Sequence, residues 1–212
     1  MNKHENTVVI NKLTPIKMKN WKFAFILLIL TSGCKTIQKT NIPDVRCKNE
    51  YYFPLQFPES ASNENDKLDK SSNEWYSELL CSIKEPILYN LKDKDLEVYR
   101  FSLIGPWDSG IVAYRIEKKD SIILLSKSSI NGKNSKFNQL SNLEDYMSLE
   151  KEIDSLDFWK MFSHSEFGKD GEEWILESYK KGQYHFVDRW SPDDTLFIQT
   201  CMLIQKLCEN KD

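Results

Sequence analysis

The sequence has few of the residues and motifs that mark common catalytic and metal sites. It contains three histidines and no His-Glu-x-x-His motif, so a zinc site would need ligands from distant parts of the chain. No Cys-x-x-Cys pair occurs, which argues against a thioredoxin-like or zinc-ribbon domain. The Gly-x-Ser-x-Gly and phosphate-loop patterns are missing as well, which disfavours α/β-hydrolase and nucleotide chemistry. We therefore expect no metal and no cofactor, and we identify no catalytic residue.

The chain also lacks a basic cluster and a long apolar run. Its 212 residues include 29 Lys and Arg against 32 Asp and Glu, a formal net charge of −3. Phosphate contacts need a concentrated basic surface, so we expect no nucleic-acid partner. The apolar run at residues 23–30 is far shorter than the ~20 residues that a membrane-spanning helix needs.

That apolar run belongs to a segment with the three parts of a secretory signal. Residues 18–22 carry two lysines, residues 23–30 are apolar, and small residues directly precede Cys34. The order resembles the bacterial lipobox, in which the cysteine is lipidated and becomes the mature N-terminus. Thr31 departs from the pattern, because an aliphatic residue is usual at that position. We predict lipidation at Cys34; the alternatives are an uncleaved anchor and an ordinary buried strand.

The predicted signal divides the N-terminal part of the chain. Residues 1–17 contain Glu5 and no apolar run, so we expect Met18 to be the initiator and residues 1–17 to be a non-native upstream extension. Removal of everything before Cys34 takes away five Lys and one Glu, which leaves 24 basic and 31 acidic residues and a net charge of −7. With residues 18–33 as the signal peptide, we expect a protein of the bacterial cell envelope, lipid-anchored to the outer membrane on its periplasmic or surface side.

Four cysteines remain once Cys34 is lipidated, namely Cys47, Cys81, Cys201 and Cys208. An exported compartment permits disulfides, and four cysteines allow three pairings. Cys201 and Cys208 would lie two turns, ~10 Å, apart on one helix, which is too far for a disulfide. That pairing is disfavoured, and the alternative is that some or all of the four are buried free thiols.

Residues 34–73 have the composition of a tether and flexible linker. Residues 59–73 carry many small polar side chains and one aliphatic side chain larger than Ala, so they cannot bury enough surface to order themselves. We expect the aromatic run Tyr51-Tyr52-Phe53, which precedes them, to lie on the surface of the domain.

Residues 74–212 are predicted to form one α+β domain. A capping box of Ser71 and Glu74 begins a helix over about 73–85, with Trp75 on its apolar face. Aromatic and β-branched runs then predict a meander and a C-terminal hairpin, and helical periodicity predicts two more helices. Strands are expected at 96–103, 111–117, 121–127, 137–143, 173–179 and 184–190, and helices at about 147–158 and after Asp193 and Asp194. The result is an antiparallel sheet of about five to six strands packed against two or three helices.

The C-terminal hairpin is defined in most detail. Gly182 supplies the positive φ that a two-residue turn at Lys181-Gly182 needs. This turn places Trp174 opposite Arg189, so the guanidinium is expected against the indole. The same register pairs Glu177 with Phe186 and Ile175 with Asp188.

The hairpin sequence resembles that of a widespread group of uncharacterised, often exported bacterial proteins. The residues that carry the resemblance are Asp170-Gly171, Trp174-Ile175-Leu176-Glu177, Gly182, Tyr184-His185 and Val187-Asp188-Arg189-Trp190-Ser191-Pro192. Further similar elements extend the likeness over roughly Trp75 to Cys208. The resemblance implies one continuous domain and does not imply any particular activity.

Charged and aromatic side chains on the predicted strands form the candidate site. Its members are Arg100, Arg115, Trp174, Glu177, His185, Asp188, Arg189 and Trp190. One interpretation is an open groove in which Arg100, Arg115 and Arg189 bind a carboxylate or another anion. The other, which we favour, is a structural ion-pair network with a Trp174–Arg189 stack, because a buried charge without a partner costs several kcal/mol.

Three classes of function follow from these features. We favour a non-enzymatic, lipid-anchored envelope protein whose domain binds a protein or a small anionic ligand. An immunity or inhibitor protein against a toxin or lytic enzyme is the second class, since an acidic anchored domain suits a basic target. An envelope hydrolase is the third, and a pocket converging on Glu177, Asp188 and His185 would favour it.

Overall fold

The computed structural model describes residues 50–55, 68–106, 110–130, 138–139, 143–163 and 170–209. The predicted signal peptide, Cys34, Cys47 and most of the predicted linker lie outside these residues. In the described part of the chain, no helix has the length and hydropathy to cross a membrane.

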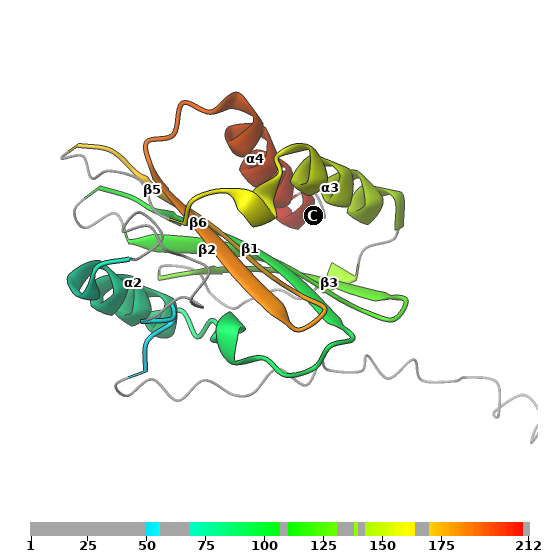
Figure 1. The fold of residues 1–212 in the computed structure, drawn as a ribbon, viewed down its shortest axis with the longest axis horizontal. Helices are drawn as coiled ribbons and strands as arrows, with labels where there is room; N and C mark the ends of the chain where they lie inside the picture. Colours follow the sequence, from blue (N-terminus) through cyan, green and yellow to red (C-terminus); the bar gives the residue numbers. More distant parts are fainter. Residues whose placement is uncertain are drawn as a thin grey trace, which may run out of the picture. The chain divides into compact units, whose positions relative to one another are not determined.

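The described residues contain one antiparallel sheet of six strands in the order β4-β3-β2-β1-β5-β6 (Figure 1). The strands are β1 Leu96–Ile104, β2 Ile111–Lys119, β3 Ile122–Ser129, β4 Asn138–Gln139, β5 Glu173–Lys180 and β6 Gln183–Trp190. The predicted meander is β1, β2 and β3, and the hairpin of β5 and β6 joins it along β1. The predicted α+β fold with an antiparallel sheet is confirmed.

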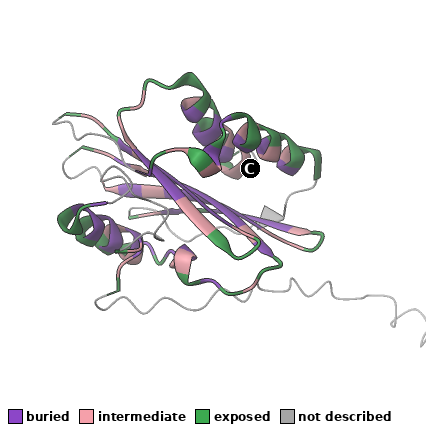
Figure 2. Ribbon diagram, in the orientation of Figure 1, coloured by how far each residue is buried: buried purple, intermediate pink, exposed green. Residues whose placement is uncertain are grey.

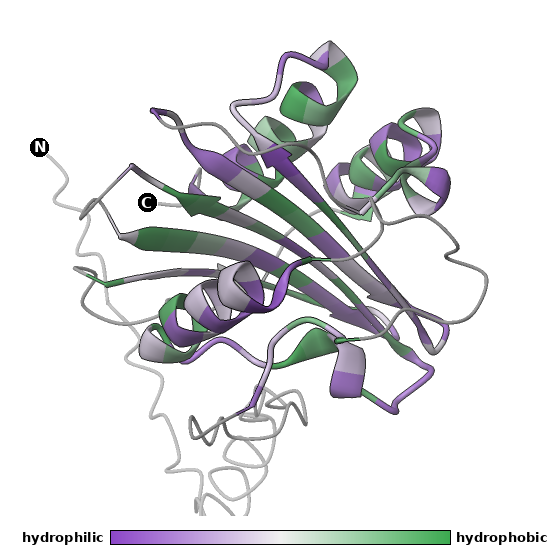
Figure 3. Cartoon of the chain, turned by 60° about the vertical axis from the view of Figure 1, so that its left-hand side comes forward, coloured by the Kyte–Doolittle hydropathy of each residue, from purple (hydrophilic) through white to green (hydrophobic). Residues whose placement is uncertain are grey.

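Helices cover both faces of this sheet (Figure 1). One face carries α3, Leu143–Ser155, and α4, Thr195–Glu209, and the other carries α2, Lys70–Ser82. Side chains along a strand therefore point alternately into a core under α3 and α4 and into a core under α2. Tyr99 and Phe101 belong to the core under α3 and α4. Figure 2 shows the resulting buried strands between the more exposed helices, and Figure 3 shows hydrophobic residues along the strands and hydrophilic residues at the turns.

The hairpin has the predicted turn and register. Lys181 and Gly182 have φ of 53° and 80°, and positive φ at both central residues is typical of a type I′ turn, whose twist matches that of paired strands. Trp174 lies opposite Arg189, as expected. The pairs Glu177 with Phe186 and Ile175 with Asp188 are present as well.

The start of α2 differs from the prediction. Its N-cap is Asp69, whose carboxylate accepts hydrogen bonds from the backbone N–H groups of Ser71 and Ser72 at 2.9 and 3.0 Å. Because a carboxylate satisfies two of the free N–H groups of the first turn, the helix begins at Lys70 rather than near residue 73. The face toward the sheet is centred on Tyr76, and Trp75 is 40% exposed.

The aromatic residues before the linker are buried, and the expectation that they lie on the surface is wrong. Tyr52 and Phe53 are both fully enclosed between α2 and the sheet. Tyr52 donates its N–H to the Ser77 hydroxyl at 2.8 Å, and Asn73 donates its side-chain amide to the Phe53 carbonyl at 2.9 Å. The packed core thus includes residues that precede 74.

Helix α3 starts and ends a few residues before its predicted bounds, whereas α4 begins directly after Asp194, as predicted. Helix α3 begins four residues before 147, and a left-handed residue, Asp157 with φ of 54°, separates it from a 3₁₀ turn at Phe158–Lys160. In α4 the cap is Asp194, which accepts from the N–H of Leu196 at 2.9 Å. The acidic residue at this end was predicted, and its charge also suits the positive end of the helix dipole.

Cysteine pairing is resolved for the described residues. Cys81, on α2, is disulfide-bonded, whereas Cys201 and Cys208, both on α4, are free thiols. The Cys201–Cys208 disulfide, which was disfavoured from the sequence, is absent. The partner of Cys81 lies outside the described residues.

Candidate functional site

The predicted strand charges meet on the face of the sheet that α2 covers. Arg100 on β1 lies opposite Arg115 on β2 and opposite Glu177 on β5. The Nε and Nη2 atoms of Arg100 donate to the two carboxylate oxygens of Glu177, each at 2.7 Å. This is the planar bidentate geometry that suits a guanidinium and a carboxylate.

Two further glutamates, which the sequence did not single out as site residues, complete the cluster. Glu85 lies just after α2, and its Oε2 is 2.9 Å from Arg115 Nε and 3.5 Å from Arg100 Nη1. Its Oε1 accepts a hydrogen bond from the Ser128 hydroxyl at 2.8 Å. Glu117, next along the same face of β2, pairs with Arg115.

Together these side chains form one continuous ion-pair network, which we call the arginine cluster. Its members are Glu85, Arg100, Arg115, Glu117 and Glu177. All are at most 5% exposed. Burial raises the pKa of Glu177, although Arg100 and the Tyr184 hydroxyl oppose that rise. Burial also acts to raise the pKa of Glu85, but Arg115 and Arg100 outweigh it and hold that pKa below its ordinary value. Each arginine is ion-paired with two buried glutamates, and Arg100 Nη1 also donates to the Pro86 carbonyl at 2.7 Å, so the arrangement corresponds to the structural alternative rather than to an open anion groove.

Arg189 lies on the opposite face and does not join the cluster. Its guanidinium donates to the backbone carbonyls of Asp188 and Phe162 at 2.7 and 2.9 Å. Trp174, its cross-strand neighbour, instead packs on Phe101, with ring centroids 5.0 Å apart. The predicted Trp174–Arg189 stack is therefore wrong, because the guanidinium is hydrogen-bonded to two backbone carbonyls, one on β6 and one in the chain after α3.

The remaining predicted residues are also separated. His185 lies within 3.1 Å of the Met161 carbonyl through Nε2 and packs edge-on against the Phe158 ring. Trp190 lies beside Gly171, where an added Cβ would come within 3.0 Å of the indole. Asp188 is buried next to Glu173, away from the arginine cluster. Glu177, Asp188 and His185 do not converge on one pocket.

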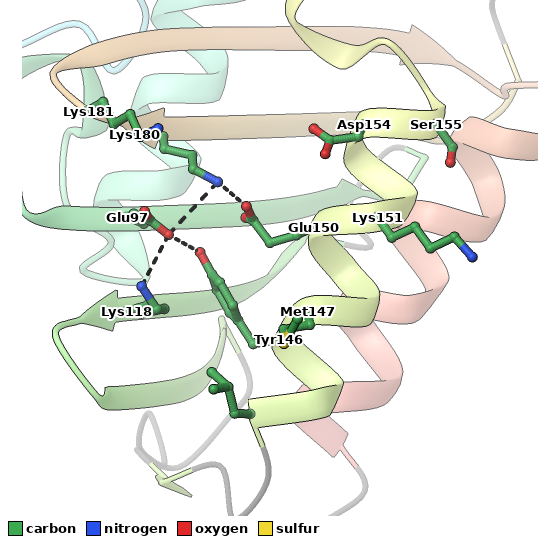
Figure 4. Close-up of a pocket in the computed structure, with 11 residues that line it drawn as sticks. Glu97, Lys118, Tyr146, Met147, Glu150, Lys151, Asp154, Ser155, Lys180 and Lys181 are labelled. Atoms are coloured by element: carbon green, nitrogen blue, oxygen red, sulfur yellow. Dashed lines mark hydrogen bonds and ion pairs between the residues drawn. The ribbon is translucent and has the colours of Figure 1, made fainter.

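A surface pocket of about 700 Å³ lies between α3 and the ends of the central strands (Figure 4). Its lining residues are Glu97, Lys118, Leu143, Tyr146, Met147, Glu150, Lys151, Asp154, Ser155, Lys180 and Lys181. Lys180 pairs with Glu150 across the seam between β5 and α3. Lys118 lies 3.5 Å from Glu97, which also accepts a hydrogen bond from the Tyr146 hydroxyl. We call this feature the α3 pocket.

The α3 pocket combines charge with exposed apolar surface. Leu143 and Met147, one turn apart on α3, are 55% and 62% exposed. The pKa of Glu97 is lower than its ordinary value. Partial burial acts to raise this pKa, but the Tyr146 hydroxyl, Lys180 and Lys118 together outweigh burial. Apart from the i, i+4 spacing of the two apolar residues, this site has no signal in the sequence, because its polar members come from three strands and a helix that are far apart in the chain.

The described residues contain no group of three or more His, Cys, Asp or Glu side chains that could hold a metal ion. Comparison of the chain with family models, with curated proteins and with solved structures found no match.

Proposed function

We propose that the chain is a lipid-anchored protein of a bacterial envelope and that its α+β domain binds a partner without catalysing a reaction. The anchor rests on the sequence at residues 18–34, in which basic, apolar and small residues precede Cys34. The binding role rests on the folded domain.

One observation carries the binding role: the buried charges are paired internally, whereas the α3 pocket offers charge and exposed apolar side chains together. Arg100 and Arg115 are buried and already paired with carboxylates of the same chain, which disfavours their use for an external anion. Leu143 and Met147 add apolar surface at a polar rim. A protein segment with mixed polar and apolar side chains suits such a surface better than a small anion does.

Site-specific photo-crosslinking in the source bacterium tests this role on the full lipidated protein. A photoreactive amino acid at position 147 is expected to give a discrete crosslinked product. The matched control is position 202 on α4, where Met202 is 45% exposed and lies outside the pocket lining. A product of equal yield at both positions, or none at 147, would contradict binding at the α3 pocket.

A further inference from the structure

The floor of the α3 pocket is a row of alternating charges. Glu97 on β1 pairs with Lys118 on β2, and Lys180 on β5 directly follows Tyr179, which pairs with Val98 on β1. The three charged residues therefore lie side by side on adjacent strands (Figure 4). The ammonium groups of Lys118 and Lys180 lie 3.5 and 4.0 Å from Glu97 Oε2, so one carboxylate stands between two cations.

The two glutamates of the pocket are engaged within the domain. Glu97 accepts a hydrogen bond from the Tyr146 hydroxyl as well as contacting its two lysines. Glu150 on α3 accepts from the Tyr99 hydroxyl through Oε1 and pairs with Lys180 through Oε2. An ammonium group has three N–H donors, and Lys180 uses no more than two of them in these contacts. The lysines of the row therefore have donors for an external acceptor.

The rim of the pocket carries more positive than negative charge. Lys151 on α3 and Lys181 in the hairpin turn are exposed, and Asp154 is the exposed acid of the lining. Over the whole lining, four lysines against three acids give a net charge of +1, whereas the complete chain has a formal net charge of −3. The pocket thus has the opposite sign to the protein that carries it.

Apolar surface adjoins these charges on α3. Leu143 and Met147 are 55% and 62% exposed, and residues at i and i+4 of a helix have their Cβ atoms about 6 Å apart on one side. Both can therefore contact a single apolar side chain of a ligand. Burial of apolar surface inside a polar rim is the usual arrangement of a protein interface.

We propose that the α3 pocket takes an acidic segment of another protein, whose carboxylates meet the pocket lysines and whose apolar side chain covers Leu143 and Met147. This inference rests on the proposed binding role and names the chemistry of the partner. Charge complementarity of this kind sets specificity and speeds encounter. A basic segment would meet like charge in the pocket. An anionic lipid surface is disfavoured, because it would face the acidic protein around the pocket as well as the lysines.

Selection from a displayed library of random peptides tests the proposal on the full-length protein in detergent micelles. Enriched peptides are expected to carry aspartate or glutamate next to a large aliphatic or aromatic side chain. Enrichment of basic or uncharged peptides would overturn the proposal, and so would a selection that enriches none.

Fluorescence anisotropy of a synthetic copy of the most enriched acidic peptide then locates its site. Lys151→Glu reverses an exposed charge of the rim and is expected to raise the Kd about fivefold or more. Met147→Ser removes apolar contact area and is expected to raise the Kd by about the same factor. Lys206→Glu, at an exposed position of α4 outside the pocket lining, is the matched control and should leave the Kd unchanged. Should Lys151→Glu fail to fold, Lys181→Gln gives the same comparison. A Kd unaffected by the pocket variants would overturn the proposal.

The photo-crosslink at position 147 separates this inference from the proposed function. Mass spectrometry of the crosslinked product identifies the partner segment, and an acidic segment supports the inference. A segment without acidic residues leaves the binding role intact and overturns the acidic ligand, whereas no crosslinked product contradicts both.

Vesicles of phosphatidylglycerol distinguish a protein partner from a lipid surface. The Cys34→Ser protein, which lacks the proposed lipidation residue, is expected to stay unbound in a flotation assay. Capture by the vesicles that is lost when Lys151→Glu is added would assign the lysines to a lipid headgroup and overturn the proposal.

Discussion

Arg100 on β1 donates two hydrogen bonds of 2.7 Å to the carboxylate of Glu177, which lies directly opposite on the adjacent strand β5. The pair is fully buried. Since Glu85 also contacts Arg100, the same guanidinium ties the chain after α2 to the centre of the sheet. The charged centre of the domain therefore contributes to the structure of the sheet.

Arg100→Met tests this structural role. The variant leaves Glu177 buried without its cation, and loss of one partner from a buried pair costs about 3–5 kcal/mol of the free energy of unfolding. Urea denaturation measures this loss. Arg189→Met is the matched control, because Arg189 donates to backbone carbonyls at a partly exposed position, and we expect it to cost about 1 kcal/mol. Equal losses in the two variants would show that Arg100 is not a special support of the sheet.

Gly182→Ala tests the turn of the hairpin. Gly182 has φ of 80° and its added Cβ would meet nothing closer than Lys94 Cγ at 3.4 Å, so the effect is one of backbone conformation. A left-handed conformation costs a residue with a Cβ roughly 1–2 kcal/mol, and thermal melting should show a lower Tm. Lys181→Asn is the comparison, since asparagine tolerates this region and favours type I′ turns. An unchanged Tm for Gly182→Ala would count against the turn.

Asp69→Ala distinguishes the two candidate caps of α2. Removal of a carboxylate N-cap costs about 1 kcal/mol, whereas Ser71→Ala should cost no more than about 0.5 kcal/mol. Burial acts to raise the pKa of Asp69, but hydrogen bonds from Ser71 and Ser72 prevail and lower it to about 2. The capping contribution is therefore present above the unfolded pKa of about 3.9 and is lost as the pH falls through about 2. The difference in the free energy of unfolding between wild type and Asp69→Ala should therefore vanish below a pH of about 2. A larger loss of stability in Ser71→Ala than in Asp69→Ala would instead support the predicted capping box.

The disulfide of Cys81 yields a prediction about its partner. Cys201 and Cys208 are free, and Cys34 is the proposed lipidation residue, so we expect Cys47 to pair with Cys81. Peptide mapping without reduction should recover a linked peptide that contains both residues. Cys81→Ser should lower the free energy of unfolding by about 2–4 kcal/mol. Recovery of Cys47 as a free thiol would exclude this pairing.

The hairpin could be predicted from the sequence because its signals are local. Gly182 lies between two aromatic runs, and once the turn is placed the register follows without further information. Alternation along the hairpin strands then places Glu177 and Trp174 on opposite faces.

The composition of the two sites could not be predicted, because both depend on contacts between distant segments. Glu85 follows a helix and Glu117 lies within a strand, and nothing local shows that both contact Arg115. Tyr52 was misplaced because a polar linker follows it, although α2 later folds over it. Register showed that Trp174 and Arg189 are neighbours, yet it could not show that carbonyls compete for the guanidinium.

The most direct test of the proposed function is the mass of the mature N-terminus of the protein extracted from membranes. Proteolysis and mass spectrometry of that N-terminal peptide should show a chain that begins at Cys34 and carries a thioether-linked diacylglyceryl group. Cys34→Ser should shift the protein to the soluble fraction. An N-terminus at another residue, or an unmodified Cys34 in membrane-bound protein, would contradict a lipid-anchored envelope protein.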